Sequence, residues 1–147
     1  MISEVRRAWK TGKSKVISNH MIRNNLAFSA YLRKLAVKIY KLTAKFPPEE
    51  KFGLVSQMRR AVNSTSSNIA EGSSRESLKD QARYSEISFG SLKELLNDSI
   101  LSLDLCFINE SELKDLRVDI YSIGFKLDGL RKSQLIRYKT ERIPKSK

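Results

Sequence analysis

Residues 47–72, PPEEKFGLVSQMRRAVNSTSSNIAEG, outline a helix with clear ends and an unusual middle. Prolines and glutamates suit a helix start, because proline's missing N–H has no partner there and acids favour the positive end of the helix dipole. Gly72 marks the predicted end of the helix. Between these signals, the polar run from Asn63 to Asn68 competes with helical hydrogen bonds through its own side chains. We therefore expect tertiary packing to stabilise this helix.

The predicted helix carries two stripes on nearly opposite sides. Apolar side chains recur every three or four positions and predict the core-facing side, at Val55, Met58, Val62, Thr65 and Ile69. The other stripe consists of amide, hydroxyl and charged groups, at Gln57, Arg60, Ser64, Asn68 and Glu71. A solvated face is usually richer in Lys, Glu and Ala, so we predict that the second stripe forms an oligomer interface. The alternative is a weak helix whose polar face is simply solvated.

Apolar periodicity predicts further helices on both sides of this segment. Residues 28–46 repeat apolar side chains every three or four positions, up to the bond between Phe46 and Pro47 that ends the pattern. Residues 78–106 carry an unbroken apolar seam, preceded by Ser77, which with an acid three residues on resembles a capping box. These patterns predict two helices that flank the central one.

A similar cap, Asn109 with Glu112, precedes a fourth apolar pattern that continues to Leu130. The connections between the patterns are short, which favours antiparallel neighbours. The sequence thus predicts an all-α protein, an up-down-up-down four-helix bundle. We place the bundle at 24–133, with a basic N-terminal extension and a basic C-terminal tail at 1–23 and 134–147.

The formal net charge of +12 is concentrated at the two ends of the chain. Residues 1–23 carry six Lys or Arg against one acid, and residues 131–147 carry seven against one. Basic ends bind nucleic acid through counterion release, whereas solvated tails that serve only solubility are the alternative. The predicted nucleic-acid contacts are Arg6, Arg7, Lys10, Lys13, Lys15, Arg131, Lys132, Arg137, Lys139 and Arg142.

The sequence offers little catalytic chemistry. His20 is the only histidine, which excludes a histidine-based triad and a multi-histidine metal site. Cys106 ends an apolar seam and is predicted to be a small buried residue rather than a nucleophile. Glu86, Glu94 and Asp98 lack the Glu-x-x-His pairs of bundle metal sites and are predicted to be surface charges. We therefore predict no catalytic residue, no metal and no cofactor.

The remaining composition indicates a single domain of 147 residues. A lone cysteine excludes an intramolecular disulfide, which fits a reducing compartment. No apolar run approaches the roughly 20 residues of a membrane span, and the N-terminus lacks the apolar stretch of a signal peptide. We expect a cytoplasmic protein with no membrane partner.

Several short motifs together resemble a known family. They are Phe46-Pro47, Phe52-Gly53-Leu54, Gln57, Arg59-Arg60-Ala61, Ser64, Asn68-Ile69-Ala70-Glu71-Gly72, Arg75, and Gly90-Ser91-Leu92 with Glu94. In this order and spacing they resemble the bacterial four helix bundle protein family, also called the intervening-sequence protein family of large-subunit ribosomal RNA genes. The chain departs from that family at Ser29, where a tryptophan is usual, and at Thr65 and Ser66, where isoleucine and proline are common.

The resemblance implies a four-helix bundle that assembles as a homo-oligomer, typically a pentamer, with no known catalytic activity. The fold is also similar to the accessory variability protein of diversity-generating retroelements, a basic pentameric partner of a reverse transcriptase and its template RNA. We therefore predict a non-enzymatic homo-oligomeric scaffold that binds RNA or DNA electrostatically, with a reverse transcriptase as a candidate partner. The alternative is a structural protein–protein interaction module with solvated tails and no nucleic-acid role.

Overall fold

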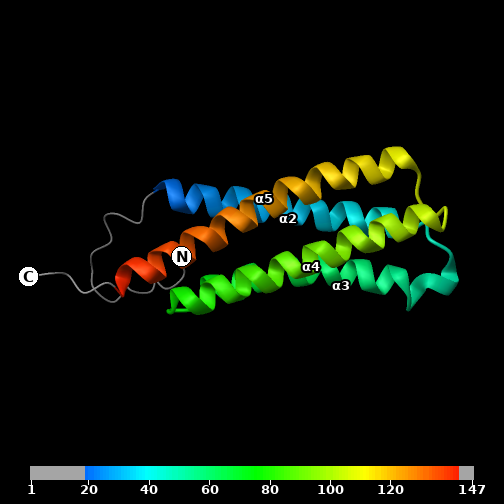
Figure 1. The fold of residues 1–147 in the computed structure, drawn as a ribbon. Helices are drawn as coiled ribbons and strands as arrows, with labels where there is room; N and C mark the ends of the chain where they lie inside the picture. Colours follow the sequence, from blue (N-terminus) through cyan, green and yellow to red (C-terminus); the bar gives the residue numbers. More distant parts are fainter. Residues whose placement is uncertain (1–18, 143–147) are drawn as a thin grey trace, which may run out of the picture.

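The computed structural model describes the backbone of residues 19–142 and the side chains of residues 28–142. Four long helices run side by side in an elongated bundle, α2 (Asn19–Thr43), α3 (Leu54–Ser73), α4 (Leu78–Asp104) and α5 (Glu110–Glu141). Successive helices run in opposite directions, so α2 begins and α5 ends at the same end of the bundle (Figure 1). The predicted all-α, up-down-up-down architecture is confirmed, and residues 19–142 contain no strand.

The start of α3 differs from the prediction. The prolines and glutamates do not form its first turn, because Pro48–Lys51 makes a separate 3-10 helix, η1, and α3 begins only at Leu54. The Glu50 carboxylate accepts a hydrogen bond from the Leu54 backbone N–H at 2.9 Å. It thereby satisfies one of the donors that a helix start leaves without a partner. The acidic segment caps α3 from outside the helix.

The hydrophobic core is built from the inner faces of all four helices. Its most deeply buried members are Leu35, Ile39, Met58, Val62, Leu92, Leu95, Leu113, Leu116, Ile123 and Leu127. The apolar stripe predicted for α3 is confirmed, because Val55, Met58, Val62 and Thr65 are buried and Ile69 packs against the core. This packing explains how a segment with weak helical propensity stays helical.

Small side chains fill the contact between α3 and α4. In this contact the buried Ser88 hydroxyl donates a hydrogen bond to the Thr65 carbonyl at 2.6 Å. Gly72 lies against Tyr84, and a Cβ atom added at this glycine would meet the Tyr84 Cβ at 2.7 Å. The sequence marks Gly72 as a helix end, and α3 does end one residue later, at Ser73. The structure adds that the glycine also permits the close approach of α4.

The seam predicted along α4 is only partly buried. Leu92 lies in the core, but Cys106 is exposed, with a φ of 58° in the connection to α5, so its predicted burial is wrong. Asp98, predicted to be a surface charge, is buried. The burial of Asp98 arises because α4 packs against α3 as well as α5, and the exposure of Cys106 has a different cause. The inward arc of α4 is therefore wider than one seam, and the helix ends at Asp104, before Cys106.

Helix α5 continues to Glu141, past residue 133, where the sequence places the end of the bundle. Gln134 is buried, and its side-chain carbonyl accepts a hydrogen bond from the Ser85 hydroxyl of α4 at 2.9 Å. The capping box of Asn109 with Glu112 starts this helix, as predicted. In the part of the chain that the structure describes, no helix is long and apolar enough to cross a membrane.

Candidate functional site

The polar face of α3 lines an open groove of about 610 Å³ between α3 and α4, which we call the polar groove. Three of the five residues predicted as an oligomer interface lie on its α3 wall, namely Gln57, Arg60 and Ser64. The α4 wall, absent from the sequence prediction, contributes Gly90, Lys93, Glu94, Asn97 and Asp98. The polar stripe of α3 is therefore one wall of a surface made by two helices.

The other two predicted interface residues do not line the polar groove. The Asn68 amide donates hydrogen bonds to the carbonyl and the hydroxyl of Ser64, at 2.8 and 3.0 Å. The Ser64 hydroxyl also shares a hydrogen bond of 2.8 Å with Ser91 of α4. Glu71 forms an ion pair with Arg75, one turn further on. Asn68 and Glu71 thus use their polar groups within the protomer.

Asp98 is the least expected member of the polar groove. Only 8% of this residue is exposed, and no ion pair involves its carboxylate among residues 28–142. Burial raises the pKa of Asp98 above its ordinary value; a hydrogen bond from Asn97 opposes the rise, and the negative charge of Glu94 adds to it. A mostly buried carboxylate at the side of an open groove is a ready acceptor for a donor from outside the protomer.

Gly90 adds a second unusual feature to the same surface. It lies in the middle of α4, where glycine costs about 1 kcal/mol of helix stability relative to alanine. A Cβ atom added there would meet nothing within 4 Å, so packing inside the protomer does not require the glycine. Its missing side chain leaves the backbone of α4 open to close approach from outside.

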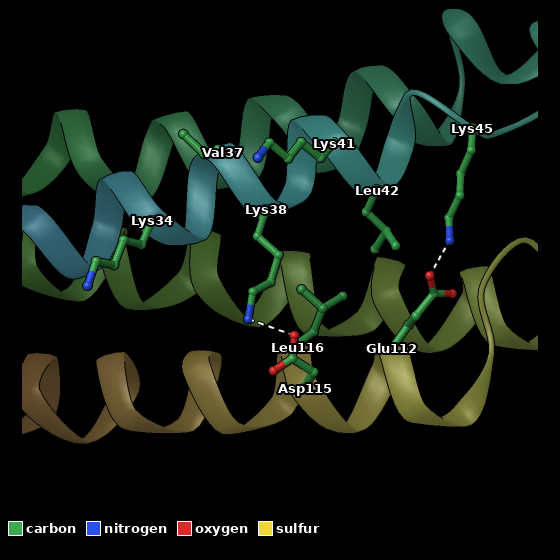
Figure 2. A pocket seen from close by; sticks show the side chains of 9 residues that line it. All are labelled: Lys34, Val37, Lys38, Lys41, Leu42, Lys45, Glu112, Asp115 and Leu116. Carbon is green, nitrogen blue, oxygen red and sulfur yellow. Dashed lines mark hydrogen bonds and ion pairs between the residues drawn. The ribbon is translucent and has the colours of Figure 1, made fainter.

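A second groove, of about 500 Å³, lies between α2 and α5 (Figure 2). Four lysines of α2 and the segment after it line one side, at Lys34, Lys38, Lys41 and Lys45. Lys38 pairs with Asp115 of α5 at 2.8 Å and also with Asp119, and Lys45 pairs with Glu112. Figure 2 shows Lys38 and Lys45 reaching across to the α5 carboxylates.

In these ion pairs the pKa values of Lys38 and Glu112 are shifted in the direction that favours the charged form. Burial lowers the pKa of Lys38, but the hydrogen bonds and charges of Asp115 and Asp119 outweigh it and raise the value above the ordinary one. The hydrogen bond from Lys45 lowers the pKa of Glu112, and the backbone N–H of Asn109 adds to the effect. Lys38 and Lys45 therefore attach α2 and the segment after it to α5, whereas Lys34 and Lys41 have no ion pair among residues 28–142.

A third groove, of about 320 Å³, lies between α4 and α5. Aromatic and aliphatic side chains dominate its lining, with Phe89, Leu92 and Leu96 from α4 and Ile120, Tyr121 and Phe125 from α5. Beside it, α5 exposes a second apolar stripe, opposite the one in the core, at Val118, Tyr121, Phe125 and Ile136. We call this stripe the outer face of α5. It was not predicted from the sequence, although its spacings of three, four and eleven residues are visible there.

The predicted nucleic-acid residues fall into two groups. Arg6, Arg7, Lys10, Lys13 and Lys15 lie outside the described residues. The C-terminal group lies on the last turns of α5, at Arg131, Lys132, Arg137 and Lys139, and at Arg142 directly after the helix. Arg131 pairs with Glu86 at 3.2 Å and Lys132 with Asp128 at 2.6 Å, so these two cations are partly neutralised. The structure thus presents the C-terminal cations on a rigid helix.

Residues 28–142 show no arrangement typical of an enzyme site. No group of three or more His, Cys, Asp or Glu side chains that would hold a metal ion occurs in the described part of the chain. Cys106 is exposed, and no base is hydrogen-bonded to it there. What the described surface offers is grooves between helices, flanked by cations and, on α5, by aromatic rings.

The fold and these surfaces define the class of protein, an antiparallel four-helix bundle with grooves between its helices. Residues 24–129 match the model of the 23S rRNA-intervening sequence protein family. The chain belongs to that family, as the motifs around Asn68–Gly72 indicate. No curated protein matches the chain.

A solved structure supports the fold. It comes from Bacteroides thetaiotaomicron VPI-5482 and is described as a protein with unknown function from the S23 ribosomal protein family. It is similar to this chain with a TM-score of 0.64 at 20% sequence identity, over 71% of this chain and 98% of that one. Because the identity is low, the likeness establishes the shared bundle and nothing about activity.

Proposed function

We propose that this protein is a non-enzymatic homo-oligomeric scaffold that presents basic surfaces to RNA or DNA. The polar groove is the observation that carries the proposal. It joins predicted interface residues of α3 to Asp98 of α4, a buried carboxylate with no ion pair among residues 28–142, and to Gly90, whose missing side chain no packing inside the protomer requires. A second copy that covers this groove supplies hydrogen-bond donors to Asp98 and packs against the bare backbone at Gly90.

The nucleic-acid part of the proposal is supported by charge. The chain carries a net charge of +12, and the last turns of α5 present exposed cations on a helix that the bundle holds in place. Oligomerisation multiplies such a surface, because each copy contributes the same basic helix end and linked weak sites bind a polyanion with increased avidity. A structural assembly without nucleic acid is the alternative.

The assembly is tested by light scattering in line with size exclusion, comparing the full chain with Arg60→Glu. Arg60 is exposed in the protomer, so reversing its charge leaves the bundle folded, as the helical circular dichroism signal would show. We expect the variant to lose the oligomer mass. Arg83→Glu is the matched control, an exposed arginine of α4 that does not line the polar groove. An Arg60→Glu oligomer with the parent's mass would contradict the proposed interface.

Nucleic-acid binding is tested by titrating the full chain into labelled RNA and DNA at several salt concentrations. For duplex DNA, the logarithm of the binding constant should fall against the logarithm of salt with a slope near −0.9 per neutralised phosphate. Failure to bind at low salt would leave the purely structural assembly as the function.

A further inference from the structure

We propose that the outer face of α5 is a stacking surface for single-stranded nucleic acid. The inference rests on the proposed function and names the class of nucleic acid and the residues that recognise it. The central residue is Phe125, which is 85% exposed, with Tyr121 one turn before it, 57% exposed. Aromatic rings held open to solvent on a rigid helix present flat faces on which unpaired bases stack, whatever their sequence.

No role inside the protomer accounts for these rings. Helix α5 already contributes a full apolar stripe to the core, from Leu113 to Leu127. A helix that is apolar on two sides is normally covered on both. The outer face is uncovered in the protomer, so its apolar area points to a ligand or partner.

Charge favours a polyanion as that ligand. From Ile120 to its end at Glu141, α5 carries five Lys or Arg against two acids. One of the two acids, Asp128, is already paired with Lys132. Across the α4–α5 groove, Lys93 lies over the ring of Phe89, at 5.3 Å from the ring centroid. Lys93 therefore lies beside the aromatic groove on α4, and the cations of α5 follow the rings along the helix, an arrangement of rings and cations that suits single strands bound by stacking and phosphate contacts together.

The dimensions of the face suit a short strand. From Tyr121 to Lys139 the helix extends for about 27 Å at a rise of 1.5 Å per residue. Gly129 lies between the aromatic rings and the last cations, and a Cβ atom added there would meet nothing within 4 Å. The glycine leaves a shallow place where a nucleic-acid backbone approaches the helix. Beside the rings, the α4–α5 groove of about 320 Å³ offers space for an unstacked base.

The test measures the affinity of the full chain for two labelled probes at one low salt concentration. One probe is single-stranded oligothymidylate about 12 nucleotides long, within the site sizes of single-strand binders, and the other is a duplex of the same length. Phe125→Ala is expected to weaken single-strand binding by about tenfold and to leave duplex binding unchanged, because only unpaired bases stack on the ring. Phe125→Tyr keeps the ring and is expected to retain the parent's affinity.

Phe52→Ala is the matched control. Phe52 is 88% exposed, close to the 85% of Phe125, but it follows η1 in the connection between α2 and α3. Its replacement is expected to change neither affinity. An equal loss of single-strand and duplex binding in Phe125→Ala, or no loss at all, would overturn the inference.

Three further outcomes distinguish failure of the stacking surface from failure of the proposed function. If Phe125→Ala also lowers the oligomer mass in light scattering, a second copy covers the outer face and the stacking surface is refuted. If the parent binds neither probe at low salt, the nucleic-acid part of the proposed function fails together with this inference. If the parent binds both probes and Phe125→Ala binds the single strand equally well, only the stacking surface fails.

Discussion

Helices α3 and α5 each have one face in the core and a second face open to the outside, and the two outer faces differ in kind. The outer face of α3 is polar and forms a wall of the polar groove, with Gln57, Arg60 and Ser64. The outer face of α5 is apolar and aromatic, around Tyr121 and Phe125, and it is flanked by cations. The difference teaches that one small bundle offers two chemically distinct surfaces, one suited to hydrogen-bonded assembly and one to flat, apolar ligands.

The largest expected change in the free energy of unfolding distinguishes the buried face of α5 from its outer face. Ile123, which is 1% exposed, lies in the core, and Ile123→Ala is expected to lower the free energy of unfolding by about 2–5 kcal/mol, from lost burial and the cavity left behind. Phe125→Ala removes a larger side chain from the outer face and is expected to change it by less than about 0.5 kcal/mol. Urea unfolding monitored by circular dichroism measures both. Comparable losses would mean that the outer face stabilises the protomer.

A smaller change in stability, of opposite sign in the two cases, is expected when alanine replaces a glycine of α3 and a glycine of α5. Gly72→Ala places a methyl group against Tyr84 and is expected to destabilise the bundle by about 1–3 kcal/mol through overpacking. Gly129→Ala fills open space in a helix and is expected to stabilise it by about 0.5–1 kcal/mol. Thermal unfolding of the two variants beside the parent shows the signs. A stabilised Gly72→Ala would mean that α4 moves away easily and that the close approach is unimportant.

The smallest expected change in stability concerns the ion pair between Lys45 and Glu112, on the side of α5 that faces α2. Lys45→Met removes the partner of Glu112 and is expected to cost about 0.2–1 kcal/mol at neutral pH, as partly exposed ion pairs do. Because Lys45 lowers the pKa of Glu112 in the folded state, this contribution is present above the unfolded pKa of a glutamate and is lost as pH falls through the folded value.

Urea unfolding of the Lys45→Met variant and the parent at neutral and strongly acidic pH checks this sign. The difference between them should shrink as the solution is acidified. Glu110→Gln, which removes an exposed acid of the same helix turn that has no ion pair in the described part of the chain, serves as the control and should show little difference at either pH. A difference for Lys45→Met that persists in acid would show that the methionine itself disturbs the packing.

The sequence was sufficient for the architecture because the inward apolar spacings and the cap of Asn109 with Glu112 are local signals. It also indicated the polar outer face of α3, because the polar run there is unusual for a helix. The outer face of α5 was not predicted, for the opposite reason. A helix that is apolar on two opposite sides loses its one-sided periodicity, and Val118, Tyr121 and Phe125 simply add to the apolar count.

Pairings between distant helices were also beyond the sequence. Lys38 lies far from Asp115 and Asp119 in the sequence, and no local pattern predicts that they form ion pairs. The burial of Asp98, which lies beside α3, depends on α3 packing against α4, and periodicity along one helix does not show that contact. For the same reason the predicted interface residues of α3 were half of a surface whose other half lies on α4.

Because the bundle has an even number of long helices, the first helix begins at the end where the last one finishes, and charge is distributed unequally between the two ends. Since α2 begins where α5 ends, one end of the bundle carries the basic last turns of α5, where residues 131–142 hold five Lys or Arg against one acid. The opposite end carries Glu49, Glu50, Asp104 and Glu110 around the connections between helices. Charge separated in this way gives the molecule a dipole moment along its long axis. In the field of a polyanion such a rod experiences a torque that turns its basic end forward before contact, which shortens the rotational search that otherwise slows association.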